Sequence, residues 1–240
     1  MLTKADITKI KSLGEKKSRL EHGLFTLEGH KIISEVKDSD FEIENIYTTQ
    51  QDADNEHVSP KEMARISQLK TPTDCLAVVK IPSYKLNFDE LNNSLILALD
   101  NVQDPGNLGT IIRIADWFGI KDILCSHLSA DCYNPKVVQA SMGAILRVRV
   151  HYTNLEEALS KITSPIYGTF LEGDNIYNHS LSANGVIVMG NEGRGISEVI
   201  EAKISSKLYI PPYPKNSPSS ESLNVATATS IVCSEFRRRV

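Results

Sequence analysis

The chain has 240 residues, of which 41% are hydrophobic and 23% are charged, so it is long enough for one large domain or two small ones with buried cores. No run approaches the roughly 18 apolar residues of a membrane-spanning helix, and the amino-terminal segment lacks the apolar core of a signal peptide, so we expect a cytoplasmic protein without a membrane partner. The formal net charge of −4 argues weakly against nucleic-acid binding, because phosphate contacts need lysine and arginine.

Residues 3–80 alternate helical and strand patterns, which predicts a small α/β unit. Its first expected helix, residues 3–21, is basic: residues 1–20 carry six lysine or arginine side chains and two acids. The chain also ends in a run of three arginines, residues 237–239. Charge runs of this kind are usually solvated helix ends, and RNA binding is the alternative. The next expected elements are strand 24–28, helix 31–36, strand 43–47, a helix from Pro60 and strand 76–80.

Residues 81–94 break this periodicity with proline, serine and asparagine, so we place a linker there. A second unit begins at Leu95 with an apolar strand, a turn and a helix-period stretch that stops at Gly119. Strand, turn and helix in this order begin a parallel α/β sheet. The remaining expected strands are 122–126, 166–170, 185–189 and 207–210, with helices between them and a last helix from about Ser222 to Arg238.

The cysteines give no sign of a metal site or of a disulfide framework. They lie far apart without CxxC spacing, so we interpret them as free thiols that mostly fill the core. No cluster of histidine, cysteine and carboxylate offers a set of metal ligands, and we expect no metal. The four residues are Cys75, Cys125, Cys132 and Cys233.

The first of three loops that carry chemistry runs from Asp100 to Arg113. We expect Asn107 to cap the helix that follows. Arg113 stands between isoleucines, so we expect it to point along an apolar strip and to meet an anion or a carboxylate there. An isolated arginine in such a place more often pairs with a nearby acid, here Asp100 or Asp116.

The second loop is glycine-rich and follows the buried strand 185–189. Gly190, Gly193 and Gly195 are expected to let backbone N–H groups face a ligand at the carboxyl end of the strand, where open α/β sheets bind small molecules. Their spacing is not GxGxxG, which disfavours a nicotinamide site. Glu192 within the turn repels phosphate and suits a hydroxyl or a cation instead. By itself the turn is a weak signal.

The third loop, residues 209–222, is rich in proline and precedes the last helix. We expect the hydroxyl of Ser222 to cap that helix. Small residues at 226–229 predict a helix face that packs very closely against another element. A proline-rich surface loop without further function is the alternative. The prolines are Pro211, Pro212, Pro214 and Pro218.

Together and in this order, these loops resemble the three motifs of the SpoU (TrmH-like) class of RNA 2′-O-ribose methyltransferases in the SPOUT superfamily. The motifs read NVQDPGNLGTIIRIAD, VIVMGNEGRGIS and YIPPY…SESLNVATATSI, and the resemblance covers about Leu95 to Val240. Residues 10–36 resemble the start of a substrate domain similar to ribosomal protein L30e. The resemblance implies an α/β fold in which a knotted parallel-sheet domain, residues 93–240 with a deep trefoil knot, follows a smaller L30e-like RNA-binding domain, residues 1–88.

The same resemblance implies an activity, a cofactor and partners. The enzyme would transfer a methyl group from S-adenosylmethionine to a ribose 2′-hydroxyl of structured RNA, with ribosomal RNA favoured over tRNA. It would form a homodimer through the knotted domain, and DNA is not an expected partner. The adenosine part of the cofactor would be held largely by backbone hydrogen bonds of Gly190, Gly193, Ile210 and Leu223, with Thr169 as a further candidate.

Five residues take catalytic roles by the resemblance. Arg113 matches the motif-one arginine that handles the 2′-hydroxyl. Because arginine holds its proton tenaciously, we expect it to stabilise the developing alkoxide and bind adjacent phosphate, and we leave open how the hydroxyl is deprotonated. Asn107 would position the loop, Glu192 is the motif-two acid, and Ser222 and Asn224 would orient Arg113 and the ribose.

The third motif departs from the family pattern, because the segment from Ile210 to Ser222 is longer, rich in proline and without glycine. We expect this insertion to reshape the RNA-facing lip or to weaken cofactor binding. A catalytically silent RNA-binding relative stays open as an alternative, although Arg113, Glu192 and Asn224 are all present. A nucleotide-dependent enzyme would need a phosphate-binding glycine loop after the first strand and an acid about 20 residues further on, and the first loop lacks this pattern.

Overall fold

The computed structural model describes residues 2–51, 54–214 and 222–238. The chain forms two compact units: Met1–Ser83 with Asp131–Leu146, and Tyr84–Ala130 with Arg147–Val240. The first unit therefore includes a segment that the sequence places between two strands of the second. Pro218 and Glu221 of the third loop lie outside the described residues.

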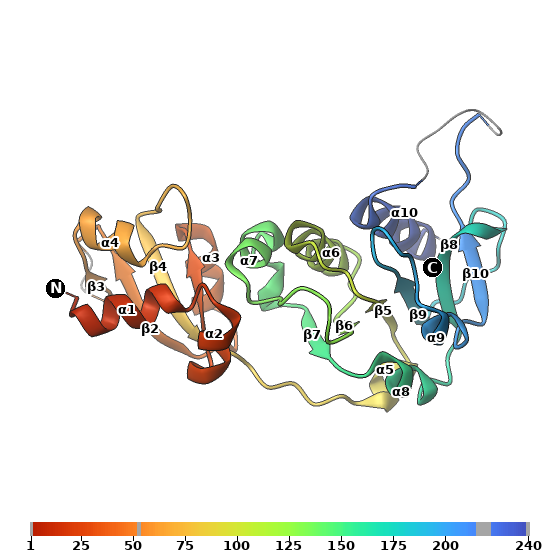
Figure 1. Ribbon diagram of the computed structural model, residues 1–240, viewed down its shortest axis with the longest axis horizontal. Helices are drawn as coiled ribbons and strands as arrows, with labels where there is room; N and C mark the ends of the chain where they lie inside the picture. Colours follow the sequence, from red (N-terminus) through yellow and green to blue (C-terminus); the bar gives the residue numbers. More distant parts are fainter. Residues whose placement is uncertain (1, 52–53, 215–221, 239–240) are drawn as a thin grey trace. The chain divides into compact units, whose positions relative to one another are not determined.

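The first unit contains a four-stranded sheet with the order β1-β4-β2-β3 (Figure 1). β4 pairs antiparallel with both neighbours, and β2 pairs parallel with β3. The three predicted strands are confirmed, whereas β3 is too short to show a periodicity in the sequence. The strands are β1 (Leu24–Glu28), β2 (Ile43–Thr48), β3 (Glu56–His57) and β4 (Cys75–Lys80).

Five helices and a 3-10 turn accompany this sheet within the described part of the first unit. α1 packs against α4, and α3 and α7 pack against β1. α1 begins with a capping box, in which the Thr3 hydroxyl accepts from the Asp6 N–H and the Asp6 carboxylate accepts from the Thr3 N–H. The elements are α1 (Lys4–Ser12), α2 (Lys16–His22), α3 (His30–Lys37), α4 (Pro60–Ile66), α7 (Pro135–Ser141) and η1 (Ala144–Leu146).

The predicted single helix 3–21 is wrong, because the chain breaks between α1 and α2. The Gln68 side chain donates to the carbonyls of Ile10 and Lys11 at 3.0 and 3.1 Å and so takes the place of the next turn's N–H groups. Gly14 permits this approach, since a Cβ there would lie 2.6 Å from Gln68 Oε1. A side chain more than 50 residues away thus ends the helix.

Arg19 on α2 is an internal residue and not part of a basic surface. Its side chain is buried and donates to the Leu13 carbonyl at 2.7 Å and to the Asp131 carboxylate at 2.6 Å. Lys9 on α1 pairs with Glu44 at 2.7 Å. The positive charge that the sequence places in residues 1–20 is therefore only partly available to a partner.

The second unit contains a six-stranded sheet with the order β10-β8-β9-β5-β6-β7, and every pairing is parallel. This confirms the predicted parallel α/β sheet and its four further strands, and adds β7, which was not predicted. The trefoil knot implied by the resemblance stays a prediction. The strands are β5 (Leu95–Leu99), β6 (Asp122–Cys125), β7 (Arg149–Tyr152), β8 (Ile166–Asn175), β9 (Gly185–Met189) and β10 (Ser206–Tyr209).

The helices of this unit confirm the predicted helix before Gly119 and the last helix, and they add a short helix where we placed the linker. α5 is capped by Asn87, and its Leu91 is buried in the core of the second unit. Five residues are too few to produce a visible helical period. The helices are α5 (Phe88–Asn92), α6 (Pro105–Trp117), α8 (Leu155–Ser160), α9 (Glu198–Glu201) and α10 (Val225–Arg237).

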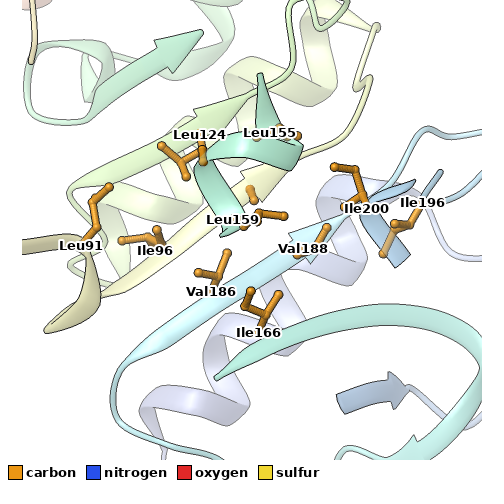
Figure 2. Close-up of a cluster of buried hydrophobic side chains, with 12 residues drawn as sticks. Leu91, Ile96, Leu124, Leu155, Leu159, Ile166, Val186, Val188, Ile196 and Ile200 are labelled. Atoms are coloured by element: carbon orange, nitrogen blue, oxygen red, sulfur yellow. The ribbon is translucent and has the colours of Figure 1, made fainter. Parts of the chain in front are cut away.

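Helices cover both faces of the parallel sheet, as burial of both faces requires. On one face, side chains of α5, α8 and α9 pack on alternate residues of β5 and β9, as Figure 2 shows for Leu159 and Ile200 beside Val186 and Val188. On the other face, the ring of Tyr167 on β8 meets Phe236 of α10 edge-on, with centroids 5.0 Å apart. α10 also packs against α6, and the first residues of α10 reach the cavity described below.

A partly buried charge cluster lies at the opposite, amino-terminal edge of this sheet, with Asp122 and His151 buried and Arg149 partly exposed. Asp122 at the start of β6 accepts hydrogen bonds from Arg149 at 2.7 and 2.8 Å and lies 2.8 Å from His151 Nε2. Burial acts to raise the pKa of the Asp122 carboxyl, but the hydrogen bonds to His151 and Arg149 outweigh it and hold the pKa below its ordinary value. We refer to these three residues as the Asp122 cluster.

Candidate functional site

A cavity of about 830 Å³ lies at the carboxyl ends of β9 and β10, beside the outer half of β8 and the start of α10. This is the edge at which open parallel sheets bind ligands. Thr169 of β8, Ile210 after β10 and Leu223 before α10 all line it. All the predicted cofactor-binding residues therefore lie around one cavity.

The glycine turn after β9 forms one wall of the cavity. The reason for which glycine is needed differs from one position of the turn to the next. A Cβ on Gly190 would lie 2.3 Å from the Gly195 carbonyl carbon, so no other residue fits there. Gly195 has φ +72°, which favours glycine. A Cβ on Gly193 would come no closer than 3.8 Å to its nearest neighbour, the Asn191 side chain. Gly193 is therefore not required by the space around it.

The expectation that the N–H groups of this turn face a ligand is wrong for four of them. The N–H groups of Asn191 and Gly195 bond to each other's carbonyls at 2.9 Å. Those of Gly193 and Arg194 donate to the Asn191 side-chain oxygen at 3.0 and 3.1 Å. These four donors are thus used within the turn and are not free to bind a ligand.

The cavity suits a nucleoside-sized ligand that carries positive charge. Its volume is within the range of about 300–1,000 Å³ that is usual for small-molecule sites. Apolar side chains of Met189, Ile196 and Val225 line it, and Glu192 places a carboxylate at its rim. Two cations also line it, Arg194 and Lys207, together with the acids Glu172 and Glu201, and Lys207 is paired with Glu201. The residues present therefore fit S-adenosylmethionine, whose sulfonium is a cation.

Three of the predicted catalytic residues, one from each motif, form a continuous hydrogen-bonded chain. Asn224 Nδ2 donates to Asn107 Oδ1 at 2.9 Å, and Asn107 Nδ2 donates to Glu192 Oε1 at 2.9 Å. The residues are 117 and 85 positions apart in the sequence, respectively. The fold brings the three motifs together at the rim of the cavity.

Both helices at this rim are capped by residues other than those we predicted. Asp104, not Asn107, caps α6 by accepting from the Asn107 N–H at 2.8 Å. Asn224, not Ser222, caps α10 by accepting from the N–H groups of Ala226 and Thr227. The caps that the sequence suggested were therefore three residues too late for α6 and two too early for α10. Ser222 is exposed and lines the cavity.

Arg113 does not point along an apolar strip as predicted. It is exposed on α6 and makes no hydrogen bond or ion pair with any other residue that the structure describes. The two acids proposed as structural partners are used elsewhere: Asp116 binds Arg147 at 2.8 Å, and Asp100 accepts from the Ser197 N–H at 2.8 Å. Arg113 is also outside the set of residues that line the cavity. Its guanidinium is therefore available to a partner from solution.

The small face of α10 explains how closely this helix approaches its neighbours. Ala226 and Thr229 are buried, and Ala228 lines the cavity. The Thr229 hydroxyl donates to the Val225 carbonyl at 2.7 Å, which satisfies its hydroxyl donor inside the core. The predicted close packing of residues 226–229 is thus confirmed for the inward-facing positions.

The four cysteines are buried free thiols, as predicted. Burial raises the pKa of the Cys233 thiol to about 12 and that of Cys125 further still. Cys233 is therefore protonated at neutral pH and is no nucleophile. Within the described ranges there is no cluster of three or more histidine, cysteine or acidic residues that could hold a metal ion. No helix in the described part of the chain is long and apolar enough to span a membrane.

Sequence reasoning missed three residues that tie the loops together: Asp100, Asn101 and Asn191. Asn101 has φ +58°, a left-handed conformation that non-glycine residues other than asparagine rarely adopt. Asn191 Nδ2 donates to the Asn101 carbonyl at 2.7 Å. An asparagine two residues after a buried strand is a turn signal, but its partner 90 residues away has no signature in the sequence.

Two family models match the chain and divide it between them. The model of the SpoU rRNA Methylase family matches residues 94–234, and that of the MRM3-like substrate binding domain matches residues 4–77. The first covers more than half of the chain and contains all of the predicted site residues. The second lies within the first compact unit.

Curated relatives and solved structures agree with these matches over nearly the full length. The 23S rRNA (guanosine(2553)-2′-O)-methyltransferase of Bacillus subtilis is 30% identical over 240 residues, which cover 95% of this chain and 94% of the relative. A TrmH-family protein from Porphyromonas gingivalis is 38% identical, with a TM-score of 0.88 and full coverage of both chains. An AdoMet-bound rRNA methyltransferase from Sinorhizobium meliloti is 26% identical, with a TM-score of 0.87 and coverage of 100% of this chain and 97% of the other.

Proposed function

Because the chain belongs to the SpoU rRNA methylase family, we propose that it transfers a methyl group from S-adenosylmethionine to a ribose 2′-hydroxyl of ribosomal RNA. The observation that carries this proposal is the chain of hydrogen bonds from Asn224 through Asn107 to Glu192 at the rim of a nucleoside-sized cavity. A catalytically silent relative would have no need to keep all three side chains in contact.

The cofactor would occupy the cavity at the carboxyl ends of β9 and β10. Gly190, Ile210 and Leu223 line it and are proposed to contact the adenosine part, with Gly193 and Thr169 beside them. When bound, S-adenosylmethionine supplies an electrophilic methyl group on a positively charged sulfur. The carboxylate of Glu192 at the rim is a favourable neighbour for that charge.

The protein's own residues then have to align the ribose hydroxyl and stabilise the charge that develops on its oxygen. Arg113, exposed and unpaired among the described residues, is proposed to bind an RNA phosphate and the developing alkoxide with its planar guanidinium. Asn107 and Asn224 would hold the ribose in register with the cavity, and Ser222 stands next to them at the rim.

RNA recognition is proposed for residues 1–88, and cofactor binding with catalysis for residues 93–240. The match of the MRM3-like substrate binding domain supports the first assignment. With Arg19 buried and Lys9 paired, the exposed Lys4 and Lys17 are the candidates for phosphate contacts. Since ribosomal RNA is the proposed substrate, we expect the protein to act in the cytoplasm.

We also propose a homodimer formed through α6 and α10. Val232, Cys233 and Phe236 are buried within the chain itself and are not left for a partner. Trp117 at the end of α6, however, is 84% exposed, which is unusual for a large aromatic side chain. It is the single tryptophan of the sequence, so its fluorescence reports on any partner that covers it.

Two experiments test these proposals. Mapping 2′-O-methyl groups in total RNA from cells with and without the gene identifies the target, and an unchanged methylation map contradicts the proposed activity. Light scattering of the purified protein tests the dimer: we expect twice the chain mass together with a Trp117 emission that shifts on dilution. A monomer at micromolar concentration contradicts the dimer.

A further inference from the structure

The glycine turn after β9 is fastened to the loop before α6 at both of its ends. Before the turn, the Asp100 N–H donates to the Met189 carbonyl at 2.9 Å. After the turn, the Ser197 N–H donates to the Asp100 carboxylate at 2.8 Å, and this carboxylate is buried. These bonds anchor the ends of the turn but leave its tip, where Glu192 stands, to be placed by other contacts.

The tip of the turn is placed by the side chain of Asn191, which uses both ends of its amide. The oxygen accepts from the N–H groups of Gly193 and Arg194, and this shapes the turn. The nitrogen donates to the Asn101 carbonyl at 2.7 Å, and this joins the turn to the loop before α6. One amide therefore both builds the wall of the cavity and connects it to the element that carries Asn107 and Arg113.

The acceptor of this bond is itself held in place. The Asn101 N–H donates to the Ser126 hydroxyl at 2.9 Å, and the same hydroxyl donates to Asn101 Oδ1 at 2.8 Å. These two contacts stabilise the left-handed backbone of Asn101, which aims its carbonyl at Asn191. Ser126 follows β6, so the brace extends to the neighbouring strand of the sheet.

We propose that Asn191 is a positioning residue that sets the distance between Glu192 and Asn107, and so aligns the cofactor wall with the RNA-facing helix α6. This proposal rests on the proposed methyltransferase function. Its two halves are separable: the Asn191 oxygen serves cofactor binding through the shape of the turn, and the nitrogen serves the rate of transfer through the connection to Asn101. Aspartate at this position keeps the acceptor and removes the donor, whereas alanine removes both.

The test compares Asn191→Asp, Asn191→Ala and a matched control, Asn184→Asp. Asn184 Nδ2 donates to the carbonyl of Asn92, 92 positions away, and its Oδ1 accepts from Ser182, so the control loses the same kind of bond outside the cavity. Calorimetry gives the affinity for S-adenosylmethionine. Single-turnover methylation of total RNA from cells lacking the gene, at saturating cofactor, gives the rate. Thermal melts give the folded fraction to which both are normalised.

We expect Asn191→Asp to bind the cofactor within about threefold of the unchanged protein but to methylate about 10- to 100-fold more slowly, because misplacement of reacting groups by a fraction of an ångström costs rate steeply. Asn191→Ala should lose about tenfold in cofactor affinity as well, since the turn loses both bonds to the side chain. Asn184→Asp should change neither quantity. Ser126→Ala should also slow methyl transfer. Its effect should be less than additive with that of Asn191→Asp, because both changes disrupt the same hydrogen-bonded connection through Asn101.

Three outcomes overturn the proposal. The first is a rate for Asn191→Asp within twofold of the unchanged protein, and the second is full additivity with Ser126→Ala. The third is an equal loss of rate in Asn184→Asp, which would show that the loss of any such long-range hydrogen bond slows methyl transfer. Failure of the proposed function is distinguishable: if the unchanged protein binds cofactor but methylates no RNA, the difference in affinity between Asn191→Ala and Asn191→Asp still tests the role of the turn.

Discussion

Replacement of Arg113 by alanine should abolish methyl transfer while leaving the fold nearly unchanged. Arg113 is exposed on α6 and has no hydrogen bond or ion pair within the described part of the chain. Surface changes of this kind alter stability by at most about 0.5 kcal/mol, which for a chain of this size shifts the melting temperature by less than about 2 °C. The residue does not line the cavity, so cofactor affinity should stay within about twofold of the original value.

The rate should behave differently, because Arg113 is assigned to the ribose and the phosphate. Loss of a group that stabilises a developing oxyanion typically lowers the rate by about 100- to 1000-fold. Lysine should restore little, since a point charge cannot bind a phosphate and the 2′-oxygen side by side as a planar fork does. Melting temperature, cofactor affinity and single-turnover methylation are therefore measured on the same preparation of Arg113→Ala.

Arg147→Ala is the matched control, because it also removes one positive charge from the surface. Arg147 binds Asp116 of α6 through Nε and Nη2 at 2.8–3.1 Å, so its loss removes a real ion pair whose two residues do not line the cavity. The pair is partly exposed, and its removal should cost no more than about 1 kcal/mol. The control should thus melt slightly earlier and methylate at the normal rate. An Arg113→Ala protein that is destabilised but active would remove Arg113 from the catalytic residues.

Three further predictions follow from particular contacts. Gly190→Ala should destabilise the protein by about 1–3 kcal/mol, because the new Cβ would collide with backbone atoms, and it should remove the calorimetric signal of S-adenosylmethionine binding. Gly193→Ala has open space around the new Cβ and should leave the melting temperature unchanged. Asp122→Asn should lower the unfolding free energy at pH 7 by about 1–3 kcal/mol in urea titrations, since it weakens the buried acceptor that binds Arg149 and contacts His151. The pKa of Asp122 is lowered in the folded state, so its contribution is fully present above its unfolded pKa of about 3.9 and is lost as the pH falls through the lower folded pKa. In acid titrations, the stabilities of the unchanged protein and the variant should therefore converge only below the folded pKa. Lys4→Ala and Lys17→Ala should each reduce the salt dependence of RNA binding by about one unit without changing cofactor affinity, and unchanged slopes would show that other residues contact the phosphates.

Much of the fold could be predicted because its signals are local. Buried strands such as 95–99 and 185–189 are continuous apolar runs, and the helix before Gly119 has a clear period and a glycine at its end. The incorrect predictions occur where a residue far away in the sequence determines the local structure. Gln68 ends α1, Leu91 makes α5 part of a core, and Asp131 draws the charge of Arg19 inside the first unit. None of these partners can be found from the spacing of residues along the chain.

The candidate site shows the same division. Resemblance of the three motifs led to Asn107, Glu192 and Asn224, which the structure joins by hydrogen bonds. Composition could not indicate which asparagine caps a helix and which one braces a turn, because the residue type suits both tasks. The glycines of the turn suggested that its backbone N–H groups bind the ligand, so the role of Asn191 was not predicted. Its side chain instead accepts hydrogen bonds from two of these groups, those of Gly193 and Arg194.

The direction of the hydrogen bonds at the rim follows from the start of α10. Asn224 Oδ1 accepts from two backbone N–H groups of that helix, which leaves its Nδ2 to donate to Asn107. With Asn107 Oδ1 thereby occupied, its own Nδ2 must donate onward, and it meets the Glu192 carboxylate. A helix cap thus sets the orientation of two amides in succession and delivers a donor to the one acid at the tip of the turn. Because amides do not titrate near neutral pH, this orientation persists whatever the protonation state of the ribose hydroxyl, and the remaining carboxylate oxygen of Glu192 stays available to cofactor or substrate.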